Sequence, residues 1–156
     1  MREIIYKILV FLGLINEKKE IIREETIYQK RNFMTNYEYK FYQNIKELED
    51  EYQIVPQLNL AAVTKKINNN RYYSELFRNI DFAIFSKDYQ ELLLLIEIND
   101  QTHNNYNRRD RDMKVKKICN DIGVKLITFY TKYPNEKTYV INRIKNELDT
   151  NKDINK

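Results

Sequence analysis

Cysteine, glycine and proline are scarce in this 156-residue chain, and each scarcity excludes something. The single cysteine, Cys119, excludes an internal disulfide framework. Two glycines and two prolines argue against many tight turns and favour long regular elements. With 42% apolar residues, 13 tyrosines and 7 phenylalanines, the composition is that of a globular protein rather than a disordered one. We therefore expect one domain with its own core, plus a short appendage.

The sequence also lacks an apolar run long enough to cross a bilayer. Residues 4–15 are apolar except for Lys7, but as a helix they span only about 18 Å, against a hydrocarbon core of about 30 Å. No small-residue cleavage site follows, which argues against a secretory signal. Three interpretations stay open: a weak membrane-surface anchor, a self-association helix, or a helix packed on the domain. We expect a cytoplasmic protein, peripheral to the membrane in the first case.

Hydrophobic periodicity predicts a mixed four-stranded sheet flanked by helices. We expect residues 1–30 to form a helical, partly apolar appendage, residues 31–148 a compact domain and residues 149–156 a frayed tail. Within the domain the predicted order is α-β-β-β-α-β-α, an α/β fold of the α+β kind.

Local signals place several of these elements. Thr35 or Asn36 can cap the first helix, and Pro56 indicates that the first strand lies at a sheet edge. Two apolar strands stand on either side of residues 86–91. Asn135 is expected to start the last helix, which we place over residues 139–148.

A helix over about residues 107–122 is predicted from an apolar stripe, and Gly123 can cap its end. The stripe consists of Val115, Ile118, Cys119 and Ile122. Extended towards the start of the helix, the same side carries Asp112, Arg111 and Arg108, whereas Lys114 projects off it. The whole chain has a net charge of only +4, but residues 108–117 hold six basic and two acidic side chains. A solvated helix face explains such a run, and so does a phosphate-binding site.

Acidic and polar residues interrupt the two apolar strands. Asp81 lies inside the first, and Glu97 ends the second, where it is followed by Asn99, Asp100 and the single histidine, His103. Burying an ionised carboxylate without a partner is costly. Each of these acids therefore needs a cation, a hydrogen-bond network or a chemical role.

Strand alternation brings two of the acids together. A hairpin centred near Tyr89 pairs residues whose numbers sum to about 178, which places Asp81 opposite Glu97. Directly opposed Cβ atoms lie about 5 Å apart, so the two carboxylates repel each other unless a divalent cation lies between them. Hard oxygen ligands suit Mg²⁺ or Mn²⁺, with the backbone carbonyl of Ile98 and waters completing the shell and Asp100 as an outer ligand.

Six stretches of the chain resemble the bacterial family known as domain of unknown function 2726, over about residues 30–145. They are FMTNYEYKFY, VPQLNLA, ELFRNIDFAIF, LLLIEINDQTH, RRDRDMKVKKIC and KLITFYTKYPNEKTYVINRI. That family belongs to the PD-(D/E)XK nuclease-like superfamily, which includes very-short-patch repair endonucleases and restriction enzymes. The resemblance implies a restriction-endonuclease-like fold for residues 31–148. Some members carry topoisomerase-type zinc fingers, which this chain lacks.

The resemblance also implies roles for individual positions. Asp81 matches the metal-binding aspartate, Glu97 the second acid of the E-x-K motif, and His103 the histidine that follows the acid strand in the repair-endonuclease branch. Asn99 stands where many superfamily members have a catalytic lysine, for which His103 or Lys114 can substitute. The matching supporting positions are Glu38, Gln57, Arg111 and Asp112.

Three functions are consistent with this pattern. The first is a metal-dependent nuclease that hydrolyses phosphodiester bonds, DNA before RNA, with Mg²⁺ or Mn²⁺ on Asp81 and Glu97 and with His103 as general acid or base. The basic side chains expected to bind phosphate are Arg108, Arg109, Arg111 and Lys114. The second is a nucleic-acid-binding module of the same fold that does not cleave. The third is a membrane-associated interaction protein whose acids are structural. A homodimer fits the first, since nucleases of this fold often pair to cut two strands.

Overall fold

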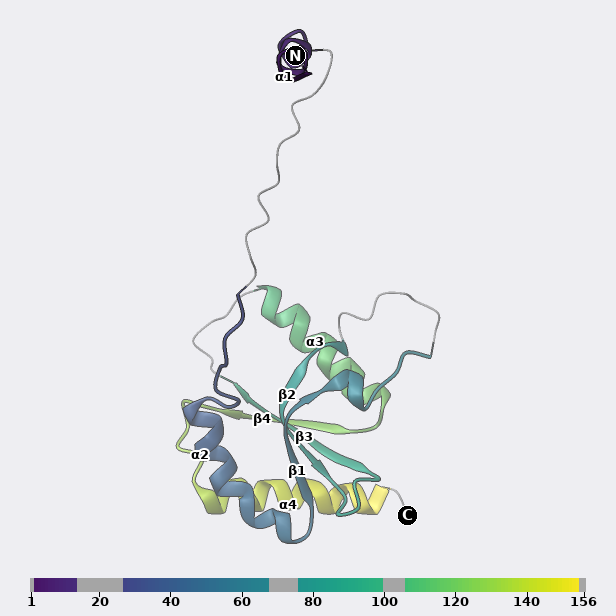
Figure 1. Cartoon of the computed structure of the whole chain (residues 1–156). Coiled ribbons are helices and arrows are strands. Elements are labelled where there is room, and N and C mark those ends of the chain that lie inside the picture. Colours follow the sequence, from purple (N-terminus) through teal and green to yellow (C-terminus); the bar gives the residue numbers. More distant parts are fainter. Residues whose placement is uncertain (1, 14–26, 68–75, 100–105, 155–156) are drawn as a thin grey trace. The chain divides into compact units, whose positions relative to one another are not determined.

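A computed structural model describes residues 2–13, 27–67, 76–99 and 106–154 (Figure 1). The chain divides into two units, Met1–Arg31 and Asn32–Lys156. In the first unit, helix α1 (Arg2–Phe11) exposes apolar side chains that recur at helical spacing. They are Ile4, Ile5, Ile8 and Phe11, followed by Leu12. No helix in the described ranges is long and apolar enough to cross a membrane.

The second unit has the predicted order of helices and strands. The longer elements are α2 (Asn36–Ile45), β1 (Gln53–Asn59), β2 (Asn79–Phe85), β3 (Leu92–Asn99), α3 (Tyr106–Asp121), β4 (Lys125–Tyr130) and α4 (Lys137–Ile154). Two short 3₁₀ turns, η1 (Lys46–Asp50) and η2 (Leu60–Ala62), flank β1. The mixed α/β fold expected from the sequence is thereby confirmed.

The four strands form one sheet in the order β1-β2-β3-β4. The first three strands are antiparallel, and β4 runs parallel to β3 after the crossover through α3. Pro56 lies in the edge strand β1, as predicted. The hairpin register is also confirmed, because Phe82 faces Ile96 and Ile84 faces Leu94, pairs whose numbers sum to 178.

Helices cover both faces of the sheet, so the unit has two cores (Figure 1). Helices α2 and α4 lie on one face, where Phe41, Phe82 and Phe129 are almost fully buried. Helix α3 lies on the other, where Val115 and Cys119 pack against Leu95. The predicted stripe of α3 is buried at Val115 and Cys119, whereas Ile118 and Ile122 are only half-buried.

The helix ends follow the capping signals in two of three cases. Thr35 caps α2 in a capping box with Glu38, and Gly123 ends the α3 turn with a φ of +70°. The prediction for Asn135 is wrong, because α4 begins at Lys137. Asn135 is instead buried with a φ of +46°. Its side-chain amide donates to the Tyr37 hydroxyl and the Tyr130 carbonyl rather than to α4. At its other end α4 continues past residue 148 to Ile154.

Candidate active site

Asp81 lies where the hydrogen-bonded ladder between β2 and β3 ends. The last pair in that ladder is Phe82 with Ile96. One residue earlier in β2, the Asp81 carboxylate accepts the Ile98 backbone N–H at 2.7 Å. The Asp81 side chain thus accepts this N–H in place of a backbone carbonyl of β2, and the pairing of β2 with β3 ends at the level of Asp81 and Glu97. Asp81 and Glu97 are not a pair of this ladder, but both line one pocket.

The edge strand is distorted at the same level. Gln57 in β1 stands opposite Asp81, but its φ of +52° removes it from the regular pairing. Buried side chains change sides across this point: Ile54 belongs to the core under α2 and α4, whereas Leu58 belongs to the core under α3. A left-handed backbone at a residue other than glycine costs about 1–3 kcal/mol, and such strain is concentrated at functional sites.

Glu38 is a third acid beside Asp81, and three contacts of α2 and β1 fix its position. One carboxylate oxygen accepts the Thr35 backbone N–H at 2.6 Å, and the other accepts the Gln57 side-chain amide at 3.2 Å. Its own backbone N–H donates to the Thr35 hydroxyl at 3.2 Å. The N-terminal cap of α2 therefore orients an acid towards the interrupted strand.

The Asp81 carboxyl has an unusual proton affinity. Its pKa is raised from 3.8 to about 6, chiefly because the half-buried group has lost water. The Ile98 N–H opposes this increase, and the neighbouring Glu38 carboxylate adds to it through its charge and a hydrogen bond. Above pH 6 the protein therefore holds an ionised carboxylate at a site that disfavours the charge.

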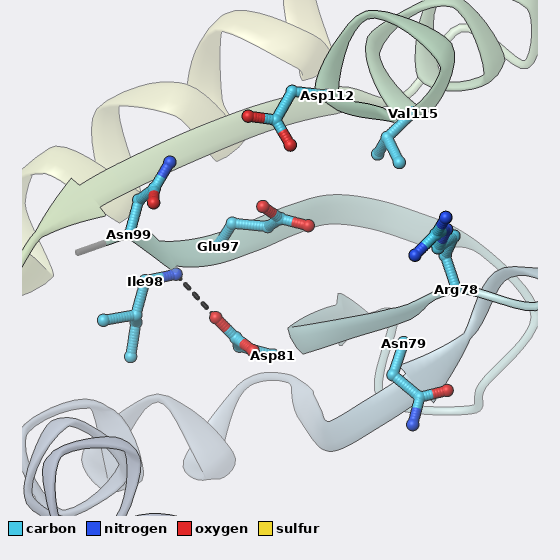
Figure 2. Close-up of a pocket in the computed structure, with 8 residues that line it drawn as sticks. All are labelled: Arg78, Asn79, Asp81, Glu97, Ile98, Asn99, Asp112 and Val115. Carbon is cyan, nitrogen blue, oxygen red and sulfur yellow. Dashed lines mark hydrogen bonds between the residues drawn. The ribbon is translucent and has the colours of Figure 1, made fainter. Parts of the chain in front are cut away.

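A pocket of about 230 Å³ opens at this position (Figure 2). In Figure 2 the carboxylates of Asp81, Glu97 and Asp112 approach it from β2, β3 and α3. The full lining consists of Arg78, Asn79, Asp81, Glu97, Ile98, Asn99, Asp112 and Val115. Glu97 also acts on the α3 core, where burial and then its charge raise the pKa of the Cys119 thiol to about 11. That thiol is therefore protonated and inert at neutral pH.

The pocket unites some of the predicted site residues and not others. Asp81, Glu97, Ile98, Asn99 and Asp112 line it, while Glu38 interacts with Asp81 and accepts a hydrogen bond from Gln57. Lys114 is not among the lining residues: its exposed ammonium pairs with Asp110 at 2.8 Å. Two predicted residues, Asp100 and His103, lie outside the described residues, as do the side chains of Arg108, Arg109 and Arg111.

Two pocket residues, Arg78 and Asn79, were not predicted. Asn79 could have been found, because it lies two positions before Asp81 on the same strand. Arg78 precedes β2 in an irregular segment, where no periodicity predicts the direction of a side chain.

The lining fits a hard divalent cation. In the described part of the chain, no three His, Cys, Asp or Glu side chains form a group that could hold a metal ion alone. Mg²⁺, however, is usually held by one or two carboxylates and several waters. Asp81, Glu97 and the Asn99 side-chain amide can supply oxygen ligands here, and two carboxylates facing one space gain from a cation between them.

Comparison with known proteins assigns the chain to a family. A family model described as "Protein of unknown function (DUF2726)" matches residues 30–150, so the chain belongs to that family. No curated protein and no solved structure gives a significant match.

Proposed function

We propose that this protein is a metal-dependent nuclease of the PD-(D/E)XK superfamily, related to the very-short-patch repair endonucleases. The proposal rests mainly on Asp81, a half-buried carboxylate with a pKa of about 6 at the end of an interrupted ladder, beside Glu97 in one polar pocket. A titratable group with a strongly shifted pKa in a cleft is a candidate functional residue. Two further observations support the proposal: the positive φ of Gln57, and the hydrogen bonds that fix the Glu38 carboxylate.

The donors of the pocket indicate which residues would hold the cation. Asp81 and Glu97 would supply carboxylate oxygens, the Ile98 carbonyl a third oxygen, and Asp112 would contribute through water. When bound, Mg²⁺ or Mn²⁺ polarises the scissile phosphate and lowers the pKa of a bound water. Deprotonated Asp81 is needed for this binding, so the site would be competent above about pH 6.

The remaining roles concern the proton and the phosphate. Asn99 lies in the pocket, and its amide can orient the attacking water, but unlike a lysine it carries no charge. Lys114 pairs with Asp110 in solvent and is poorly placed to replace the catalytic lysine of the superfamily. Arg78, which lines the pocket, would bind the phosphate and stabilise its developing charge. His103 remains our candidate for general acid or base.

One observation favours a second function, a nucleic-acid-binding module that does not cleave. Asn99 is a neutral side chain at the position where a charged amine is expected, and Lys114 does not reach the pocket. In that case the acids would serve metal-assisted binding only, and the phosphodiester bond would stay intact.

A cleavage assay separates the two functions. The purified full chain is incubated with supercoiled plasmid, single-stranded DNA and RNA, with Mg²⁺, with Mn²⁺ and with chelator. We expect cleavage only with metal, a loss of at least about 100-fold in Asp81→Asn and Glu97→Gln, and a loss of about 10- to 100-fold in Arg78→Gln. Asp121→Asn, which alters an exposed charge on α3, should cleave like wild type. Intact substrates in all three cases, with either metal, would contradict the nuclease.

A further inference from the structure

A tyrosine-rich turn adjoins the pocket at the end of β4. Tyr130 pairs with Asn99 in the parallel register of β3 and β4, and the Thr131 N–H donates to the Asn99 carbonyl at 3.1 Å. Asn99 is itself part of the pocket lining. The turn formed by residues 130–133, which we call the tyrosine turn, is therefore joined directly to the candidate active site.

Aromatic and basic side chains are interleaved in the tyrosine turn. The Tyr133 N–H donates to the Tyr130 carbonyl at 3.1 Å and closes the turn. The two rings lie edge to face with centroids 6.5 Å apart. Between them in sequence, the Lys132 ammonium lies 5.9 Å from the Tyr130 centroid and 4.9 Å from that of Tyr133. Tyr133 is nevertheless 54% exposed, so a large part of its surface is open to a ligand.

Hydrogen bonds of the buried Asn135 fix the tyrosine turn to the rest of the domain. Its buried amide donates to the Tyr130 carbonyl at 2.9 Å and to the Tyr37 hydroxyl of α2 at 2.7 Å. Its backbone carbonyl accepts the Asn44 side-chain amide at 3.2 Å. Because the ring of Tyr133 sits on a preformed turn, a ligand that stacks on it pays little entropy for ordering the protein.

We propose that the tyrosine turn binds an unstacked base next to the scissile phosphate, and that single-stranded nucleic acid is therefore the preferred substrate class. This inference rests on the proposed nuclease function. Every base has a π-face that stacks on an exposed aromatic ring, but in a duplex that face is covered by its neighbours. The Lys132 ammonium lies over one face of the Tyr133 ring. With a base stacked on the other face, this ammonium would contact the adjacent phosphate.

Binding without cleavage tests this inference separately from the nuclease proposal. Fluorescence anisotropy with chelator present compares a labelled single-stranded oligothymidine with a duplex of the same length. We expect tighter binding of the single strand, and a loss of about 5- to 100-fold for it in Tyr133→Ala. Tyr133→Phe should retain the affinity, because it keeps the stacking ring.

Tyr89→Ala is a matched control. Tyr89 is 56% exposed and contacts one aromatic ring, that of Phe85, but it lies in the hairpin at the other end of β2 and β3. Its removal should leave the affinity unchanged. Lys132→Gln should reduce the slope of log K against log salt by about 0.7 for the single strand.

Two results would overturn the inference: equal affinity of wild type for the two forms, or equal losses in Tyr133→Ala and Tyr89→Ala. Either would leave the nuclease proposal standing if plasmid is cleaved with metal. Conversely, stacking on Tyr133 without any metal-dependent cleavage would refute the nuclease alone.

Discussion

The Asp81 side chain links the chemistry of the pocket to the stability of the fold. A carboxyl whose pKa is about 6 in the folded protein and 3.8 ordinarily binds its proton more tightly in the folded state. Protonation of Asp81 therefore stabilises the folded state below about pH 4, and this contribution is lost as the pH rises from about 4 to 6. At neutral pH the ionised Asp81 destabilises the protein unless a cation is bound.

Replacing Asp81 by asparagine should therefore stabilise the protein without metal. Asparagine can still accept the Ile98 N–H, but it carries no charge to desolvate. We expect the free energy of unfolding in urea to rise by about 1–3 kcal/mol at pH 8, and by about a third of that at pH 4.5. Asp121→Asn, on the exposed side of α3, is the control and should change stability little. A less stable Asp81→Asn protein at pH 8 would show that this acid is structural.

The turn between β4 and α4 depends on one asparagine. Asn135 supplies both a left-handed backbone and two side-chain hydrogen bonds. Asn135→Ala should lose the bonds and strain the backbone, which we expect to cost about 2–4 kcal/mol of unfolding free energy. Asn135→Gly keeps the backbone relaxed and should cost about 1 kcal/mol less.

Thermal or urea unfolding of the two variants measures both contributions. Equal losses would mean that the φ of +46° carries no strain. If neither variant is destabilised, the buried amide does not hold the turn, and the rigidity that we assign to the tyrosine turn would be wrong.

Strands and helices were predictable where periodicity is regular. The alternation in β2 and β3 predicted the register of their hairpin, and the α3 stripe predicted the burial of Cys119. The exchange of core sides at Gln57 was not predictable, because no residue type in that strand requires the positive φ found there. Arg78 was missed because it lies before β2 begins, where no alternation predicts the direction of a side chain.

The fold of the second unit explains why the pocket lies where it does. Two cores on opposite faces hold β2 and β3 firmly along most of their length. At the Phe82–Ile96 end of their shared ladder β2 and β3 part, and near this point α2, α3 and β1 each contribute a polar residue. Side chains on rigid elements are held more accurately than side chains on loops. If a cation binds as proposed, the side chains that hold it are therefore in place before it arrives.

The most direct test of the account is calorimetric titration of the full chain with Mn²⁺ and Mg²⁺ at pH 7.5 and pH 5. We predict Mn²⁺ binding at pH 7.5 that weakens about 10-fold at pH 5, because protons compete for a carboxyl with a pKa of about 6. Asp81→Asn and Glu97→Gln should each abolish it, and Asp121→Asn should not. A wild-type protein that binds neither cation at pH 7.5, or an Asp81→Asn protein that binds Mn²⁺ equally well, would contradict a metal site in this pocket.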